Sequence, residues 1–112
     1  MSSGVNITVS SSERWGMNTI QIKTPSPEQS LPLVKGALEM EKKLTRDSLA
    51  ISESRITTLV RQLGVTVEQV LGGVVARGEE NEQDLLDLEG ELELRRTLQE
   101  TLTHLEQLEV CR

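Results

Sequence analysis

The sequence is nearly without aromatic residues: its 112 residues include one Trp and neither Tyr nor Phe. Aromatic side chains contribute the largest buried areas to compact cores, so Leu, Ile and Val must supply almost all of the buried surface here. The shortage favours long helices, an oligomer or both. It disfavours a β-sandwich, a β-barrel and an aromatic-lined ligand pocket.

Residues that carry catalysis and metal binding are also scarce. The only histidine is His104 and the only cysteine is Cys111, which leaves no zinc-ligand set and no internal disulfide. Glu100 and His104 lie one helical turn apart, which we interpret as an ordinary surface contact. The sequence contains no glycine-rich phosphate loop and no nucleophile motif. We therefore expect no enzymatic activity, no cofactor and no metal.

Long apolar runs are missing as well. No stretch approaches the ~20 consecutive apolar residues of a membrane span. The N-terminus lacks the basic and apolar regions of a secretory signal. Together with the lone cysteine, these absences predict a cytoplasmic protein without a membrane association.

One short stretch near the N-terminus has the pattern of a β-strand. In Met17–Lys23, Ile20 and Ile22 point one way and the polar residues between them point the other way. A single strand cannot satisfy its own backbone groups. We therefore expect this strand to pair antiparallel with the same strand of a second copy, across a two-fold axis.

The residues before this strand are typical of a linker. Val5–Val9 alternates apolar and polar residues and is a second candidate strand, but serines and glycines flank it. We interpret residues 1–16 as a flexible Ser/Gly-rich extension and residues 17–112 as the folded domain. Met17 is an alternative start of translation.

Apolar residues then recur every three or four positions, which predicts helices. Ser26 and Pro27 suit a helix start and Gly64 suits the residue after a helix end, so a long helix is expected over 28–63. Thr66-Val67-Glu68-Gln69 matches a capping box and opens a short Val-rich elbow.

A second long helix is expected from residue 79 to about residue 110. Both long helices carry interrupted Leu-rich seams, through which we expect two hairpins to dimerise and build a four-helix core: Met40, Leu44, Ile56, Leu59, Leu63, Leu85, Leu88, Leu92, Leu98, Leu102 and Leu105. The sequence thus predicts a mainly α protein. Its long antiparallel αα-hairpin has a short helical elbow and is preceded by one short β-strand that pairs across a homodimer.

Acidic residues are concentrated at the start of the second helix. Residues 79–93 contain eight carboxylates and no basic side chain. An ordinary explanation is a solvated helix face, which the helix dipole and pairing with Lys42, Lys43, Arg46 or Arg55 would support. The functional explanation is a surface that docks a basic partner, with these candidate residues: Glu79, Glu80, Glu82, Asp84, Asp87 and Glu91. A Mg²⁺ site is a minor third interpretation, because the first helix lacks a suitably spaced second carboxylate pair.

The strand also allows a DNA-binding interpretation. Residues 17–30, with outward-facing Thr19, Gln21 and Lys23, resemble the opening of ribbon-helix-helix repressors. However, the first helix continues to Leu63 where that fold needs a turn, and an acidic chain lacks the positive field that DNA binding requires. Nucleic-acid binding is therefore a minor alternative.

The layout from Met17 onward resembles small acidic antitoxins of prokaryotic toxin–antitoxin modules. The resemblance rests on the strand, the long charged first helix, the elbow Gly64-Val65-Thr66-Val67-Glu68, and the acidic segment 79–93 before a Leu-rich helix. It implies a non-enzymatic dimer that binds and neutralises a partner toxin and regulates its own expression. The alternative is an architectural coiled-coil or adaptor protein whose acidic residues only keep it in solution.

Overall fold

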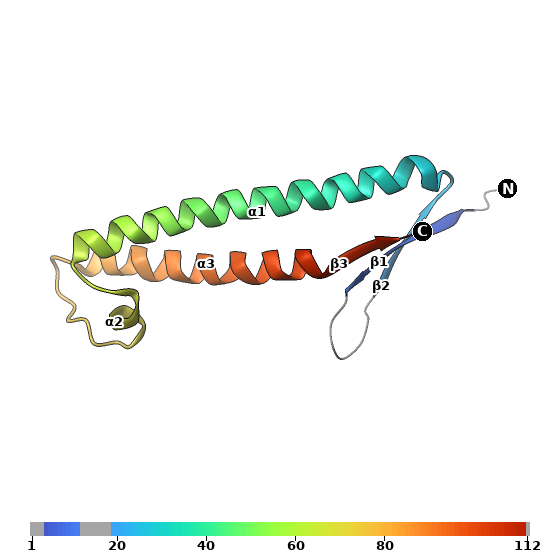
Figure 1. Ribbon diagram of the computed structural model, residues 1–112. Helices are drawn as coiled ribbons and strands as arrows, with labels where there is room; N and C mark the ends of the chain where they lie inside the picture. The colour runs from blue at the N-terminus through green and yellow to red at the C-terminus, as the bar shows by residue number, and fades with distance from the viewer. Residues whose placement is uncertain (1–3, 12–18, 112) are drawn as a thin grey trace. The chain divides into compact units, whose positions relative to one another are not determined.

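The computed structural model describes residues 4–11 and 19–111 of the chain. It is mainly helical, with one three-stranded antiparallel sheet (Figure 1). In chain order the elements are β1 (Val5–Ser11), β2 (Thr19–Thr24), α1 (Pro27–Leu63), α2 (Val67–Leu71), α3 (Glu82–Gln107) and β3 (Leu108–Cys111). The prediction of two long helices is confirmed. The second helix is shorter at both ends than expected, and its last residues continue into β3.

The chain divides into two compact units. Residues 1–45 and 100–112 form the first, which we call the sheet unit, and residues 46–99 form the second, which we call the hairpin unit. The sheet unit contains the three strands, the first part of α1 and the end of α3. The hairpin unit contains the rest of α1, α2 and most of α3. Among the described residues, no helix combines the length and the apolar character needed to cross a membrane.

The sheet unit contains three strands where the sequence indicated one. β1 is the central strand and pairs antiparallel with both β2 and β3. The interpretation of residues 1–16 as a flexible extension is therefore wrong for Val5–Ser11, while residues 1–3 and 12–16 lie outside the described part of the chain. Serine was misread as a linker signal: Ser10 and Ser11 are both buried members of the central strand.

The strand register places the apolar side chains on one face of the sheet. Ile7 of β1 lies opposite Ile22 and Val9 lies opposite both Ile20 and Val110, and cross-strand partners share a face. Ile7 is fully buried, whereas Ile20, on the edge strand β2, is 69% exposed. β2 therefore has a partner within its own chain, so the lone-strand argument for a homodimer is wrong. The same pairing removes the basis for a ribbon made of one strand from each subunit.

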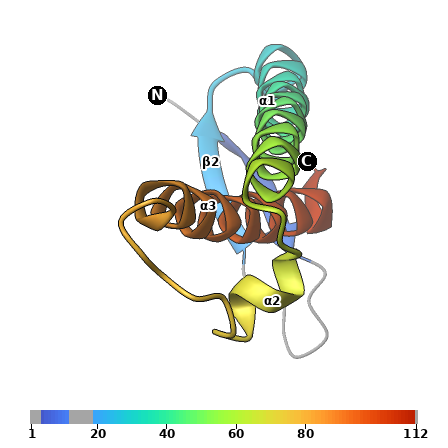
Figure 2. The same cartoon turned by 90° about the vertical axis from the view of Figure 1, so that its left-hand side faces the viewer.

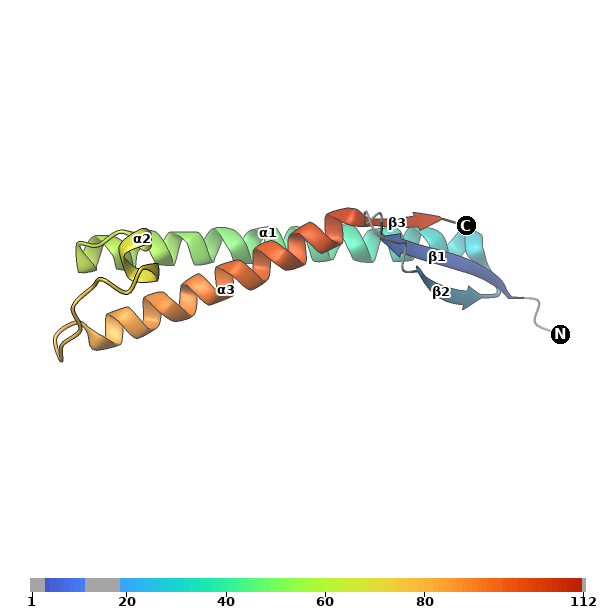
Figure 3. The ribbon, with the colours of Figure 1, turned by 90° about the horizontal axis from the view of Figure 1, so that it is seen from below.

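The core of the hairpin unit lies between α1 and α3, which run antiparallel within this unit (Figure 3). Ile56, Leu88 and Leu92 form its buried cluster. Partly buried apolar residues from α1, the turn after it and α2 pack against this cluster: Leu59, Val60, Leu63, Val65, Val67 and Val70. Full burial of a Leu or Ile side chain stabilises by roughly 1.5–3 kcal/mol, so each member of this cluster contributes on that scale to the stability of the unit.

The buried face of α1 is a continuous heptad-like seam that passes through polar residues. Leu38, Lys42, Thr45, Leu49, Ser52 and Ile56 succeed one another at alternating spacings of four and three, and all are buried or half-buried. Thr45 satisfies its hydroxyl by donating to the Glu41 carbonyl oxygen at 2.8 Å. The apparent interruption in the Leu pattern was therefore a sequence of inward-facing polar residues.

This seam corrects the predicted core of the first helix. Met40 and Leu44, which we expected in the core, are 56% and 52% exposed. They share a helical face with Leu33, which is also exposed, because these three residues are separated by seven and four positions. Further along the chain, Leu85, Leu88, Leu92 and Leu105 are buried, and Leu98 and Leu102 are half-buried.

The elbow between the long helices contains the short helix α2 (Figure 2) and has the predicted caps. The Thr66 hydroxyl accepts from the Gln69 amide at 3.1 Å, and the Gln69 side chain accepts from the Thr66 amide at 2.9 Å, which confirms the capping box. Gly64 ends α1 with φ +66°, the left-handed conformation expected after a helix end.

Two glycines allow a matched stability test. Gly64→Ala is expected to lower the free energy of unfolding by about 1–2 kcal/mol, because a side chain disfavours positive φ. Gly36→Ala, inside α1, is expected to raise it by roughly 0.5–1 kcal/mol, because a Cβ there would meet no other atom within 4 Å. Urea unfolding followed by circular dichroism measures both. Equal effects of the two substitutions would contradict the assigned helix end.

Candidate functional site

The predicted acidic segment lies at the loop before α3 and along the first turns of this helix. The loop is shaped by Asn81, whose side chain accepts from the Gly78 amide at 2.8 Å and donates to the Ala76 carbonyl oxygen at 2.9 Å. The Glu82 amide also donates to the Gly78 carbonyl oxygen at 2.9 Å. These bonds fix the direction in which the chain enters α3.

A single arginine in this loop binds two of the carboxylates. Arg77 donates from Nε and Nη2 to Glu82 at 2.9 and 3.0 Å, and from Nη2 to Glu89 at 3.0 Å. The fork geometry suits arginine, which presents several donors in one plane. The sequence predicts basic partners of the acidic segment on the first helix only. Arg77 precedes the segment in sequence by only two residues, and the loop folds it back onto α3.

The Arg77 pair changes the titration of Glu82. The hydrogen bond from Arg77 is the largest of the effects that hold the pKa of Glu82 below its ordinary value. The hydrogen bonds to Glu82 and then Glu89 raise the pKa of Arg77 above its ordinary range. A carboxyl whose pKa is lowered in the folded state stabilises fully above its ordinary pKa, and the stabilisation is lost as pH falls through the lowered value.

Arg77→Gln is therefore expected to raise the pKa of Glu82 back toward its ordinary value and to loosen the loop at neutral pH. A carboxyl titration by NMR measures the pKa, and amide exchange of residues 76–81 measures the loosening. Arg96→Gln is the control, because Arg96 lowers the pKa of Glu93 in the same way but does not contact Glu82. An unchanged pKa of Glu82 in Arg77→Gln would contradict this assignment.

Glu91 is used inside the hairpin unit. Ser52, which is buried on the facing helix, donates from its hydroxyl to Glu91 Oε2 at 2.9 Å. Arg55 lies 3.4 Å from Oε1 of the same carboxylate. Two residues of α1 thus hold Glu91, so its charge is matched within the chain. The expected pairing of the acidic segment with Arg55 is observed.

The remaining predicted carboxylates stay available to solvent. Glu79 and Glu80 are exposed in the loop, Asp84 is half-buried, and Asp87 is exposed and accepts from the Gln83 side chain at 2.8 Å. Among residues 4–11 and 19–111, none of these four has a basic partner. Most of the unmatched negative charge of the segment therefore resides in these four side chains, and Glu82 and Glu89 add one more charge because they share the single arginine Arg77.

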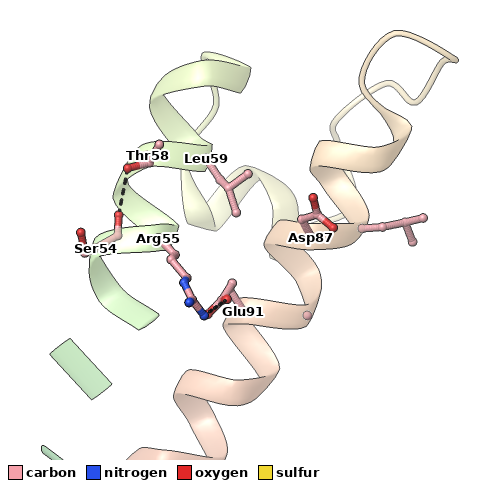
Figure 4. A pocket seen from close by; sticks show the side chains of 8 residues that line it. Ser54, Arg55, Thr58, Leu59, Asp87 and Glu91 are labelled. Atoms are coloured by element: carbon pink, nitrogen blue, oxygen red, sulfur yellow. Dashed lines mark hydrogen bonds and ion pairs between the residues drawn. The ribbon is translucent and has the colours of Figure 1, made fainter. Parts of the chain in front are cut away.

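An open groove lies beside one of these carboxylates, Asp87, between α1 and α3 of the hairpin unit (Figure 4). Its volume is about 560 Å³. Leu59, Leu86 and Gly90 provide apolar surface, and the charged residues Asp87 and Glu91 line it as well. Figure 4 shows Leu59 projecting from α1 between the two helices.

Three of the other polar groups that line the groove, Thr58, Arg55 and Glu91, have partners within the chain. The Thr58 hydroxyl donates to the Ser54 carbonyl oxygen at 3.1 Å, and Arg55 is held by Glu91. The groove therefore offers apolar contact, the Ser54 side chain and one exposed carboxylate, Asp87, which no basic residue of the described chain contacts. No sequence pattern indicates the groove directly, because its walls come from two helices whose relative rotation is set by packing.

In the parts of the chain that the structure covers, no group of three or more His, Cys, Asp or Glu side chains is arranged to hold a metal ion. Cys111 is exposed at the end of β3, outside the hairpin unit. No family model matches the chain, and no curated protein or solved structure is significantly similar to it.

Proposed function

We propose that this chain is a non-enzymatic, antitoxin-like protein-binding module that acts in the cytoplasm and binds a basic partner through the acidic segment of the hairpin unit. The observation that carries the proposal is the charge left over after internal pairing. The hairpin unit contains eleven acidic and six basic residues, and its arginines 55, 77 and 96 are already paired. A negative surface of this kind attracts a basic partner over a distance and fixes its orientation.

The test uses paired variants that remove equal charge. In one, four carboxylates of the segment are neutralised: Glu79→Gln, Glu80→Gln, Asp84→Asn and Asp87→Asn. In the control, four exposed carboxylates elsewhere are neutralised: Glu41→Gln, Glu53→Gln, Glu68→Gln and Glu109→Gln. We expect a basic protein from the native host to co-purify with the unmodified chain and with the control, but not with the segment variant.

Salt gives an independent criterion. Exposed charge pairs are screened at high ionic strength, so the complex is expected to weaken as salt is raised. Recovery of the unmodified chain alone at every salt concentration would overturn the proposal. That result would favour the architectural alternative, which the heptad-like seam of α1 supports independently.

We further propose that two copies associate through the sheet unit. Its outer strand β2 has one unpaired edge and carries Ile20 and Ile22, while Leu33, Met40 and Leu44 leave an apolar helix face uncovered. The sheet unit has nearly balanced charge, six basic against seven acidic residues, so two copies repel little. Exposed edges and apolar patches are the usual sites of such association.

Sedimentation should therefore give about twice the chain mass of 12.4 kDa. Ile20→Lys is expected to shift the equilibrium to monomer without unfolding, because Ile20 is mostly exposed. Lys23→Gln on the same strand is the control and should leave the dimer intact. A monomer at all concentrations in the unmodified chain would exclude this assembly.

A further inference from the structure

We propose that the groove between α1 and α3 of the hairpin unit receives an amphipathic, basic helix of the partner protein. The apolar side of that helix would rest on Leu59, Leu86 and Gly90. This inference rests on the proposed function and specifies how the partner is held. It adds an apolar anchor to a surface that was recognised only by its charge.

The first support is apolar surface that the fold leaves uncovered. Leu86 lies between the buried residues Leu85 and Leu88 of α3, but it is 51% exposed. It lines the groove together with the half-buried Leu59 of α1. Leucines on facing helices that share a solvent-open groove are the kind of surface on which the apolar face of another helix packs.

The second support is a glycine in the middle of α3. Glycine lowers helix stability, and a Cβ at Gly90 would meet no other atom within 4 Å. The packing of the described chain therefore does not require a glycine there. Because Gly90 has no side chain, the backbone of another helix can approach α3 closely at this position, which lines the groove.

The shape of the groove favours a helix over a small molecule. Small-ligand pockets enclose most of their ligand, whereas this groove is open on its solvent side. Its walls, residues 54–59 of α1 and 86–91 of α3, extend for about 7–8 Å along each helix, which is long enough for successive anchor residues of a partner helix. The Thr58 hydroxyl already donates a hydrogen bond within α1, so it does not need a polar group of the partner.

Charge selects a basic partner over a second copy of this chain. Asp87 lines the groove without a basic partner among the described residues, and Asp84 lies one turn before it on the same helical face. Lysine or arginine beside the apolar stripe of a docked helix would meet these two carboxylates. A second hairpin unit, which is itself acidic, would be repelled.

The test uses a synthetic amphipathic peptide of leucine and lysine, about 14 residues or four helical turns long. A second peptide has the same lysines but serine in place of leucine. Binding to the full chain is measured by calorimetry at moderate salt. We expect the leucine peptide to bind at least about tenfold more tightly than the serine peptide. Amide shifts should be largest at residues 54–59 and 86–91.

The decisive variant is Gly90→Leu, which places a side chain in the groove and favours the helix. Gly36→Leu is the matched control, because Gly36 is also a helical glycine with open space around it but lies in the sheet unit. Gly90→Leu is expected to lower the affinity for the leucine peptide by about tenfold or more. Gly36→Leu is expected to leave this affinity unchanged. Circular dichroism checks that both variants stay helical.

The outcomes separate this inference from the proposed function. Equal binding of the two peptides, or unchanged binding of the leucine peptide to Gly90→Leu, would overturn the proposal that a partner helix docks in the groove. If the segment variant with four neutralised carboxylates still loses the native partner in that case, the proposed function stands without the groove. If the segment variant keeps its partner but Gly90→Leu loses the leucine peptide, helix docking in the groove is supported and partner binding through the acidic segment is rejected.

Discussion

Leu88→Asp is expected to unfold the hairpin unit. Leu88 is completely buried and forms the centre of the cluster with Ile56 and Leu92. Truncating such a leucine to alanine costs about 2–5 kcal/mol, and burying an unpaired carboxylate costs more. Because small domains are stable by only about 5–15 kcal/mol, the aspartate should remove most of the folded population.

Leu86→Asp is the control for this prediction. Leu86 lies two residues earlier on α3 but is half exposed, so the new carboxylate can remain in water. We expect its helical signal and its urea midpoint to stay close to those of the unmodified chain, while Leu88→Asp loses the cooperative transition. Similar midpoints for the two variants would contradict the assignment of Leu88 to the core.

A chain that begins at Met17 is expected to lose the sheet. Such a chain lacks β1, the central strand, so β2 and β3 would each lose the partner to which they are hydrogen-bonded. It also lacks Ile7, which is fully buried in the sheet unit. The amide resonances of β2 and β3 should therefore collapse toward random-coil positions. Those of the hairpin unit should persist, because that unit has its own buried cluster.

Point substitutions in β1 test the same conclusion in the full-length chain. Ile7→Ala is expected to lower the stability of the sheet unit by about 2–5 kcal/mol, in the range found for buried aliphatic side chains. Val5→Ala, at an exposed position of the same strand, should have a much smaller effect. Native-state amide exchange of β2 measures both. An intact β2 in the chain that begins at Met17 would restore the interpretation of the first residues as an extension.

The helices were predictable because their signals are local. The spacing of apolar residues, Gly64 after α1 and the capping box at Thr66 depend on neighbours within a few positions, and the structure has each of them. The strand at 19–24 was found for the same reason. β1 has the same alternation of apolar and polar residues, but the serines in and around it favoured a linker. Only the pairing of β1 with β2 and β3 shows that Ser10 and Ser11 are buried in a strand.

The sequence predicted where the acidic residues of the candidate site lie, but it did not predict most of their side-chain partners. The sequence located the carboxylates of residues 79–93 and the arginine at position 55 as a possible partner. It did not show that Arg77 binds Glu82 and Glu89, or that Ser52 and Arg55 hold Glu91. These contacts depend on how a loop turns and how two helices rotate, and neither is encoded in a fixed residue spacing.

The sequence by itself determined that this chain is mainly helical, poor in bulky core residues, and acidic at the start of its last helix. These properties follow from composition and short-range periodicity. Only the tertiary structure decided which face of α1 is buried, because Thr45 and Ser52 occupy inward-facing positions while Met40 and Leu44 face solvent. Packing selects one helical face as a whole, so polar residues on that face are buried and apolar residues outside it remain exposed.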